Sequence, residues 1–568
     1  MRVLIIDGYT DEPAGLGVPP YLDVYPRYIA GAVWKFDPTA DVIYLTIDQT
    51  RQDRDTVKKV STASDFSIVV AGVTVPGKYL GGAPATAGDV LRLPSLLQSK
   101  HTAICGPAAK FGFGRGGGSM AQVPREMNDL YEFSIAGDPE IVVTDLLQGS
   151  FAPTDTDAVR GSENEINGFA ARGARIITQH PKFPAGLICE IETYRGCPRS
   201  LKGGCSFCTE PLHGTPDFRS VQGISREVAA LYSYGAVNFR LGRQPDLLIY
   251  GSRDDNEYPA PNPSAIKRLF SALRRSAPSL KVLHIDNVSP ATIYNHPDAS
   301  EAALREIVSQ HTPGDVAALG IESADEEVIR RNNLKVYPEG ALLAISVINE
   351  VGGERGNNGL PHLLPGINFV YGLPGETRRT FEANLEFMKR VLGAGLLVRR
   401  INLRQVMVMP DTRLESFGDQ LVHRHRSLFI KHKAAMRSEI DTPMLRRVAP
   451  EWTVLKGVRT ELVEGNMTWS RQIGSYPILV GIPKVLPPDL SLDVIVLSHG
   501  PRSVSGLPYP IGINHIGMRE LEALPGVGSR RAASLIRARP FRDPADLSAR
   551  VKDSEFMDPL IRFLDFAP

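Results

Sequence analysis

Three cysteines in one short loop are the residues of this 568-residue chain best suited to chemistry. Cys197, Cys205 and Cys208 follow an apolar run, 185–191, that predicts a buried strand. Three thiolates can hold three irons of a 4Fe-4S cluster. A structural zinc site needs four nitrogen or sulfur ligands, and the nearby His213 lies past the last cysteine. The pattern predicts a metal centre with one open corner; a zinc knuckle or a redox dithiol is the alternative.

The apolar run before the cysteines belongs to the first of six strands expected in the central part of the chain. These strands alternate with helical segments and lie at residues 187–193, 237–241, 281–287, 316–321, 366–371 and 401–407. Such βα units predict a partial (β/α)6 barrel that is open enough to admit a large substrate. Barrel chemistry is expected at the carboxyl ends of the strands, and the cysteine loop follows the first strand.

The cysteine loop resembles that of the radical S-adenosylmethionine (SAM) superfamily. Cys205 and Cys208 form a C-x2-C pair with an aromatic residue, Phe207, before the second cysteine, as in that family. The first gap departs from the family pattern, because seven residues separate Cys197 from Cys205 and the family usually has three. The resemblance implies that the three cysteines bind a 4Fe-4S cluster and that its open iron chelates SAM.

Several expected strand ends are similar to the positions that contact SAM in this superfamily. Residues 320–323 with 332–333 resemble its fourth-strand motif, and residues 368–377 resemble its fifth. The second strand ends in Arg243 and Gln244, where the family often has acidic groups. A Gln oxygen can still accept from an ammonium, whereas arginine suits a carboxylate better. The resemblance implies SAM contacts by the following side chains: Phe207, Gln244, Glu322, Asn368 and Tyr371. A helix-capping or ion-paired Glu322 and an ordinary turn in the last motif are the alternatives.

Strand and helix signals also alternate in residues 1–150, which predicts an open, Rossmann-like parallel sheet. The expected strands lie at 3–7, 42–47, 66–71 and 101–105, and a helix is expected at 25–36. Ligands of such sheets bind beyond the carboxyl ends of the strands, which are followed here by glycine-rich segments. Neither G-x-G-x-x-G after the first strand nor G-x-x-x-x-G-K-[ST] occurs, which argues against a dinucleotide or nucleoside triphosphate site.

An open sheet that precedes a radical SAM core resembles the cobalamin-dependent radical SAM enzymes, over residues 1–415. The resemblance implies that cobalamin contacts the loops that contain Gly8, Thr74, Val75, Gly106 and Pro107. The D-x-H-x-x-G signature of many corrinoid proteins is absent, so no histidine of that motif would ligate cobalt. A sheet that serves only in packing is the alternative.

The remaining segments divide the chain further. Between residues 118 and 186 the pattern weakens, and only a strand at 141–147 and a polar helix at 162–173 are expected. Residues 151–186 are expected to link the sheet to the barrel at 187–415. Residues 416–510 combine a basic stretch, 423–433, with runs that indicate a small β-barrel. This barrel loosely resembles the RNA-binding barrel of methylthiotransferases. The basic stretch is a solvated helix face, a segment that closes the central barrel, or a contact for a polyanion.

Residues 511–568 match a helix-hairpin-helix pattern with a tight turn at 525–528. Backbone N–H groups of Gly526 and Gly528 at a helix N-terminus can hold a phosphate, and Arg530 and Arg531 add charge without reading sequence. The unit therefore contacts nucleic acid or only packs.

Composition limits the class of protein. A chain of 568 residues is expected to form three or four domains. Its net charge of +1 argues against a globally basic nucleic-acid binder, and its five cysteines do not suggest a secreted disulfide framework. Residues 1–8 predict a strand and turn, not a signal peptide, and no apolar run is long enough to span a membrane. We expect a cytoplasmic protein in a reducing compartment.

Two classes of enzyme remain. Methylthiotransferases carry three further cluster cysteines in their N-terminal domain, whereas Cys105 stands alone here. Methylation of an unactivated sp3 carbon therefore fits better, and the chain resembles the enzymes that methylate a glutamine of methyl-coenzyme M reductase in methanogens. Such an enzyme needs an external electron donor and a protein substrate; no side chain is assigned a catalytic role. A radical SAM enzyme that modifies tRNA or another RNA is the alternative, and a non-catalytic nucleic-acid scaffold leaves the cysteine loop unexplained.

Overall fold

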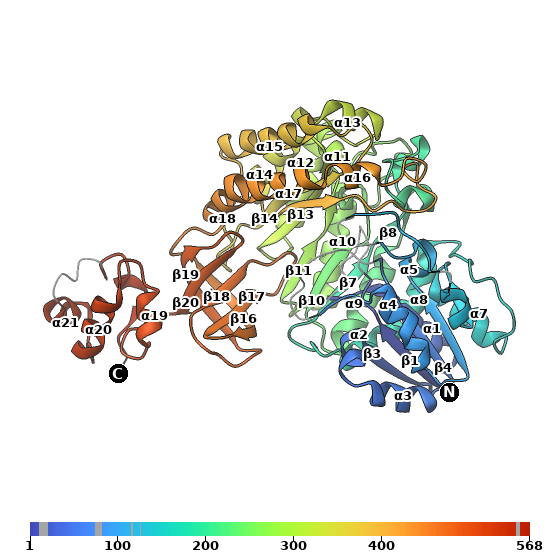
Figure 1. Ribbon diagram of the computed structural model, residues 1–568, viewed down its shortest axis with the longest axis horizontal. Coiled ribbons are helices and arrows are strands. Elements are labelled where there is room, and N and C mark those ends of the chain that lie inside the picture. Colours follow the sequence, from blue (N-terminus) through green and yellow to red (C-terminus); the bar gives the residue numbers. More distant parts are fainter. Residues whose placement is uncertain (11–20, 74–81, 115–117, 125, 552–556, 568) are drawn as a thin grey trace.

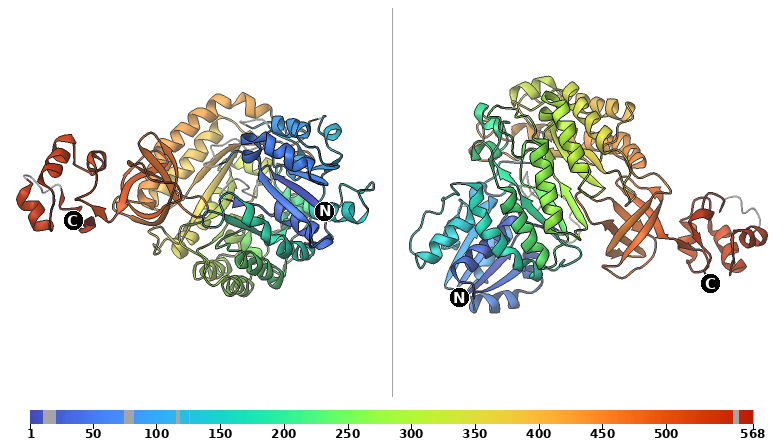
Figure 2. Two further views of the ribbon diagram at one scale, coloured as in Figure 1. Left: turned by 90° about the horizontal axis from the view of Figure 1, so that it is seen from below. Right: turned by 180° about the vertical axis from the view of Figure 1, so that it is seen from behind.

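The computed structural model describes residues 1–10, 21–73, 82–114, 118–124, 126–551 and 557–567. The chain forms an N-terminal sheet, a central barrel of two sheets covered by helices, a small β-barrel and a helical tail (Figure 1). The tail lies at the end of the molecule farthest from the N-terminal sheet in all views (Figure 2). The α/β class with parallel sheets is therefore confirmed.

The N-terminal sheet has five parallel strands in the order β3-β1-β4-β5-β6. Their bounds are Asp41–Thr46, Arg2–Asp7, Phe66–Val70, His101–Cys105 and Phe133–Ile135. Val3 and Ile5 pack into one apolar core, and Leu4 and Ile6 into another, so both faces of the sheet are buried. Burial on both faces explains why these strands are continuous apolar runs in the sequence.

Helices cover both faces of this sheet. One face is covered by α1 (Val24–Phe36), α7 (Pro139–Gln148) and α8 (Asn167–Gly173). The other is covered by α2 (Ile47–Gln52), α3 (Arg54–Thr62), α4 (Ala87–Arg92) and α6 (Met127–Leu130).

The strand expected at 141–147 is wrong, because these residues belong to α7. Pro139 stands at the first helical position after Asp138, where its fixed φ angle favours a helix. The buried residues Val142, Val143, Leu146 and Leu147 recur at helical spacing. The β-branched composition of the run suggested a strand, but the Asp-Pro start and this spacing favour the helix.

The central barrel consists of two four-stranded parallel sheets, β11-β10-β7-β2 and β12-β13-β14-β15. The strands are β2 (Tyr21–Leu22), β7 (Ile188–Glu192), β10 (Asn238–Gly242), β11 (Val282–Ile285), β12 (Asn287–Val288), β13 (Asp315–Glu322), β14 (Leu363–Tyr371) and β15 (Ile401–Gln405). Only Asp286 separates β11 from β12, so the sheets follow one another around the barrel. All six predicted strands are present.

Helices surround the convex side of the barrel (Figure 1). They are α9 (Val221–Ser233), α10 (Pro263–Ser276), α11 (Pro290–Asn295), α12 (Pro297–Val308), α13 (Glu326–Arg331), α14 (Pro338–Gly352) and α15 (Arg378–Gly393). The edge strand β2 comes from the N-terminal part of the chain and pairs in parallel with β7. The first 150 residues therefore contribute strands to the N-terminal sheet and also to one sheet of the central barrel.

The C-terminal part begins with α16 (Gln420–Arg424), α17 (Arg426–Met436) and α18 (Thr442–Val448). A closed five-stranded barrel follows, formed by β16 (Val454–Glu464), β17 (Met467–Gln472), β18 (Leu479–Ile482), β20 (Ser503–Tyr509) and β19 (Ser491–His499). The tail contains α19 (Met518–Glu522), α20 (Ser529–Ala538), α21 (Pro544–Arg550) and the strand pair β21 (Ile511–Gly512) and β22 (Leu564–Asp565). No helix in the described ranges is both long and apolar enough to cross a membrane.

Buried ion pairs join the N-terminal part to the barrel. Arg27 of α1 and Arg219 both pair with Glu227 of α9, and all three side chains are fully buried. Arg219 also donates to the backbone oxygen of Glu192, at the end of β7, over 2.7 Å. Because a guanidinium without a partner in the protein interior is very costly, these pairs fix how α1 lies on the barrel.

We expect Glu227→Gln to lower the free energy of unfolding by about 3–5 kcal/mol, because two buried guanidinium groups lose their counter-charge. Thermal and urea unfolding midpoints of the full chain measure this. Glu382→Gln is the matched control, since its pair with Arg378 is exposed and such pairs contribute about 0–1 kcal/mol. Equal midpoints for the two variants would contradict this role of Glu227.

Candidate functional site

The long gap between Cys197 and Cys205 folds back on itself. A short 3-10 helix, Pro198–Lys202, is followed by Gly203 and Gly204 with φ angles of +76° and +61°. The Gly204 N–H donates to the Arg199 oxygen over 2.8 Å, and a Cβ at Gly204 would lie 2.3 Å from the Pro211 ring. The positive φ angles of these two successive glycines reverse the chain direction. The seven residues between Cys197 and Cys205 therefore form a compact turn, and the three cysteines stay in one loop.

Two asparagines after α13 hold this loop against the barrel. The Asn332 Oδ1 accepts from the Ser206 hydroxyl over 2.7 Å, and the Asn332 backbone oxygen accepts from the Ser206 N–H over 3.0 Å. The Asn332 amide also donates to the Pro374 oxygen over 2.8 Å, and Asn333 donates to the Gly204 oxygen over 2.8 Å. The cysteine loop is therefore tied to the ends of β13 and β14.

The three thiols share a buried environment with two cationic side chains. Arg199 Nη1 lies 3.1 Å from the Cys205 Sγ. Burial raises the pKa of Cys197 to about 11 and that of Cys208 further, and the neighbouring thiols contribute to both shifts. Burial alone would lower the pKa of Lys335, but the negative charges of Cys205, Glu322 and Cys197 raise it. Lys335 therefore stays protonated beside the three cysteines.

This donor set fits an iron-sulfur cluster. In the part of the chain that the structure describes, no three histidine, cysteine, aspartate or glutamate side chains are close enough together to hold a single metal ion. The thiolates of a 4Fe-4S cluster each bind a different iron and need not converge on one point. Cys197, Cys205 and Cys208 would hold three of the irons.

Glu322 ends β13 next to the cysteine loop. It is 8% exposed and has a φ angle of +67°, which is unusual for a residue with a side chain. Burial raises its carboxyl pKa to about 7, although Lys335 and Arg404 oppose the shift. A carboxylate and an ammonium at the open side of the cysteine loop suit the amino and carboxylate groups of SAM.

The other predicted SAM residues lie in different surroundings. Phe207 packs in an apolar cluster with Cys205 and Leu373, so it lies at the loop. Gln244 is fully buried, accepts from the Thr193 hydroxyl over 3.1 Å and donates to the Leu241 oxygen over 3.1 Å. Asn368 is half-buried on β14 and accepts from Asn402 over 3.2 Å.

Tyr371 is not brought together with this group. Its hydroxyl lies 2.6 Å from the His432 Nε2 of α17, and its ring stacks on Phe381 of α15. Successive side chains of a strand point to opposite faces, and Tyr371 points to the helical layer outside the barrel. Its side chain anchors α17 in this structure.

The adjoining Gly-Leu-Pro-Gly-Glu-Thr run forms a turn that is closed by its own glutamate. Glu376 Oε2 accepts from the Gly372 N–H over 2.6 Å, and Oε1 lies 2.8 Å from the His425 Nδ1. Both His425 and His432 belong to the basic stretch, and both bind the barrel. This stretch therefore closes the barrel beside β14, with its remaining charges on the outside of α16 and α17.

The carboxyl ends of the strands of the N-terminal sheet face the carboxyl edge of the central barrel. The segment after β5 pairs with the chain after β15, where Ala121 donates to the Val408 oxygen over 2.8 Å and Val408 donates to the Ser119 oxygen over 3.0 Å. Val73 and Phe111 from the N-terminal part pack on Met409. The carboxyl edges of the two sheets thus lie opposite one another.

The predicted cobalamin residues are only partly described. Thr74 and Val75 lie outside the described residues. A Cβ on Gly8 would lie 2.5 Å from the Val70 oxygen, and one on Gly106, whose φ angle is +89°, 2.9 Å from the Ala71 oxygen. Pro107 is buried at the first position of α5 (Pro107–Phe111). Close strand packing accounts for both glycines, and none of the three described residues offers a side-chain ligand for cobalt.

Sequence reasoning missed Lys335 and Arg199. Lys335 interrupts an apolar segment, Leu334 to Val336, directly after the two asparagines. A lysine between two apolar residues that follow the Asn332–Asn333 pair was the sequence signal that could have pointed to a buried cation. Arg199 lies inside the unusual first gap and pairs with Glu257 over 3.1 Å, a contact between distant segments that no sequence pattern indicates.

Comparisons with known proteins agree with this geometry. Residues 191–388 match the radical SAM superfamily. An uncharacterized protein of Archaeoglobus fulgidus is 41% identical over 97% of each chain. An uncharacterized protein of Methanocaldococcus jannaschii is 44% identical over 89% of this chain and 93% of its own. A tRNA-2-methylthio-N(6)-dimethylallyladenosine synthase of Anaplasma marginale is 23% identical over 36% of this chain and 40% of its own.

Among solved structures, the radical S-adenosylmethionine methyltransferase TsrM from Kitasatospora setae aligns with a TM-score of 0.47 and 13% identity, over 82% of this chain and 79% of its own. The near-complete archaeal relatives and the superfamily match determine the assignment. The chain belongs to the same family as these archaeal proteins and is a radical SAM enzyme.

Proposed function

We propose that the chain is a cobalamin-dependent radical SAM C-methyltransferase that acts on an unactivated sp3 carbon of a protein. The observation that carries the proposal is the opposition of the two carboxyl edges at 119–121 and 406–408. Ligands of both kinds of sheet bind at this edge. A methyl-donating cofactor on one edge would therefore face the SAM site on the other.

The protein's own groups would bind and orient the cofactors. Cys197, Cys205 and Cys208 would hold the cluster, and Glu322 and Lys335 would orient SAM through its ammonium and carboxylate. When bound, the cluster and SAM supply a 5'-deoxyadenosyl radical, and methylcobalamin supplies a methyl group. The apolar contact of Val73 and Phe111 with Met409 would keep water from the space between the edges.

Cobalt would receive no histidine from the N-terminal sheet. The only histidine before residue 150 is His101. It begins β5, at the amino edge, where it stacks on Phe151 and lies 2.9 Å from Glu132. Two observations support cobalamin: the carboxyl edges of the N-terminal sheet and the barrel lie opposite one another, and the sequence resembles cobalamin-dependent enzymes. No step is assigned to a cobalt ligand.

The proposed substrate is a glutamine side chain, and the resemblance favours that of methyl-coenzyme M reductase. RNA is the second candidate, because the Anaplasma marginale relative is a tRNA-modifying enzyme and a small closed barrel follows the radical SAM domain. Sulfur insertion is disfavoured. Cys105 and Cys189 are fully buried in strands, burial raises the pKa of both thiols, and that of Cys189 reaches about 12.

Cys205→Ala should lower the iron content from about four per chain to near zero, since a cluster needs all three thiolates. Iron analysis and the visible spectrum of protein purified without oxygen measure this. Cys189→Ala is the matched control, because Cys189 is buried in β7 away from the loop, and it should keep its iron. A Cys205→Ala protein with full iron would refute the ligand assignment.

Glu322→Gln should weaken SAM binding roughly 10- to 100-fold, because the carboxylate charge that would pair with the SAM ammonium is lost while an acceptor oxygen is kept. The shape of the side chain is kept, so the loss reports on charge. Equilibrium binding of SAM to cluster-loaded protein is the measurement. Glu327→Gln, on the exposed side of α13, should bind SAM normally. Unchanged binding by both variants would remove Glu322 from the SAM site.

Methyl transfer tests the function itself. Protein incubated with cobalamin without oxygen should contain about four iron and one cobalt per chain. With labelled SAM and a reductant, it should transfer a methyl group to a glutamine-containing peptide and not to RNA. Iron without cobalt, or labelled RNA with an unlabelled peptide, would overturn the proposal and favour an RNA-directed radical SAM enzyme.

A further inference from the structure

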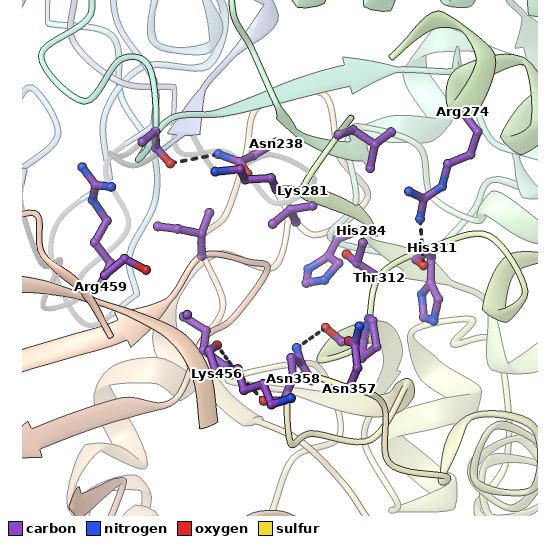
Figure 3. A pocket seen from close by; sticks show the side chains of 18 residues that line it. Asn238, Arg274, Lys281, His284, His311, Thr312, Asn357, Asn358, Lys456 and Arg459 are labelled. Atoms are coloured by element: carbon purple, nitrogen blue, oxygen red, sulfur yellow. Dashed lines mark hydrogen bonds between the residues drawn. The ribbon is translucent and has the colours of Figure 1, made fainter. Parts of the chain in front are cut away.

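A cavity of about 620 Å³ lies between the central barrel and the C-terminal β-barrel (Figure 3). On the central barrel it is lined by Asn238 and Val282, the first residues of β10 and β11. The cysteine loop follows the last residue of β7, and β7, β10 and β11 are parallel. The cavity is therefore at the edge of the barrel opposite to the radical SAM site.

The walls of the cavity are positively charged. Arg274 and Lys281 come from the central barrel, and Lys456 and Arg459 come from β16. None of the lining residues that the structure describes is an aspartate or a glutamate. In Figure 3, Lys281 lies on one side of the space, and Lys456 and Arg459 lie on the side of the C-terminal barrel. Cations thus approach it from both domains.

Three of these four cations have no carboxylate partner within the described ranges: Arg274, Lys281 and Lys456. Arg274 is half-buried, and burial lowers its pKa. Its guanidinium donates to the backbone oxygens of Gln310, over 2.6 Å, and His311, over 3.0 Å. Arg459 pairs with Asp489, which is exposed. Of the three, only Arg274 is partly desolvated, and a bound anion would offset the cost of leaving its charge unpaired, whereas the two lysines are exposed and available to an anion.

The cavity also offers neutral polar groups. Asn357 and Ser491 line it together with the four cations. An amide and a hydroxyl each donate and accept hydrogen bonds, so these side chains suit the hydroxyl groups of a ligand.

The walls are joined before any ligand binds. The Gln472 side-chain amide donates to the Asn358 and Lys456 backbone oxygens over 2.8 and 2.9 Å, and the Lys456 backbone N–H donates to the Asn358 backbone oxygen over 3.1 Å. A Cβ on Gly359 would lie 2.1 Å from the Val454 oxygen, so the two walls are in close contact. A cavity that is largely formed in advance is typical of small-molecule sites.

The lining favours a small ligand over a nucleic-acid strand. Apart from His284 and His311, no aromatic side chain occurs among the described lining residues. Single-stranded nucleic acid is usually held by aromatic side chains that stack on its bases. Cations on two walls suit phosphate groups at both ends of a compact molecule.

We propose that this cavity binds a small phosphorylated polyol, with two or more phosphate groups and free hydroxyls, as a ligand that bridges the central barrel and the C-terminal barrel. The site is separate from the proposed methyl transfer and does not depend on it.

Titration calorimetry of the full-length chain with fructose 1,6-bisphosphate and with pyrophosphate tests the proposal. We expect one saturable site, a higher thermal unfolding midpoint with either probe, and no binding of fructose. Lys281→Met and Lys456→Met, on opposite walls, should each weaken binding roughly tenfold. Both lysines are exposed and unpaired within the described part of the chain, so either variant should fold.

Lys431→Met is the matched control, because Lys431 is an exposed lysine on α17 outside the cavity, and its binding should equal that of the unaltered chain. The proposal fails if neither probe binds at constant ionic strength. It also fails if all three variants lose binding equally, or if only an RNA oligonucleotide binds. The last result would assign the cavity to a nucleic-acid backbone.

Discussion

Pairing of buried guanidinium groups is the constraint on which the arrangement of this protein depends. Arg27 and Arg219 are fully buried where the N-terminal part packs on the barrel, and Arg240 is fully buried inside the barrel. Each must meet carboxylates in a defined geometry, because a buried unpaired charge is more costly than the interface around it can offset. Arg240 meets Glu190 of β7 over 2.7 Å and also pairs with Asp286. Few ways of docking two sheets can satisfy all these pairs at once.

Further ion pairs of arginines with carboxylates determine how the N-terminal sheet is oriented relative to the central barrel. Arg243, at the end of β10, lies 3.2 Å from Asp23, which precedes α1, and its guanidinium lies over the Tyr25 ring. In the sequence, Arg243 departs from the acidic residues of the family and suits a carboxylate, and in the structure that carboxylate belongs to Asp23 of the N-terminal part. Arg195, beside the cysteine loop, pairs with Asp138 before α7 over 2.8 Å. These contacts keep the carboxyl edges opposed, so the site depends on charges outside it.

Much of the fold could be predicted because burial leaves a periodic pattern. All six barrel strands and the hairpin before Ser529 follow from apolar runs and turn residues. Contacts between distant segments were not predictable. The fold-back of residues 198–204 depends on two asparagines that lie more than 120 positions later in the chain, and Asn333 follows its partner Gly204 by 129 positions. The orientation of Tyr371 depends on α17, and the pairing of β2 with β7 joins segments that no local pattern connects.

The C-terminal barrel completes the base of the central barrel, and this structural role bears on whether its presence indicates an RNA substrate. Its β17–β18 loop inserts Tyr476 into the base of the central barrel, where the hydroxyl lies 3.0 Å from Asp286 and 3.2 Å from Arg240. Arg400 covers the ring at 3.7 Å, and the Ser475 N–H donates to His284 over 2.8 Å. Removing this loop would leave Arg240 and Asp286 with fewer partners and would open the base to water. A barrel that completes the core in this way is required for stability whether or not it binds RNA, so its presence is weak support for an RNA substrate.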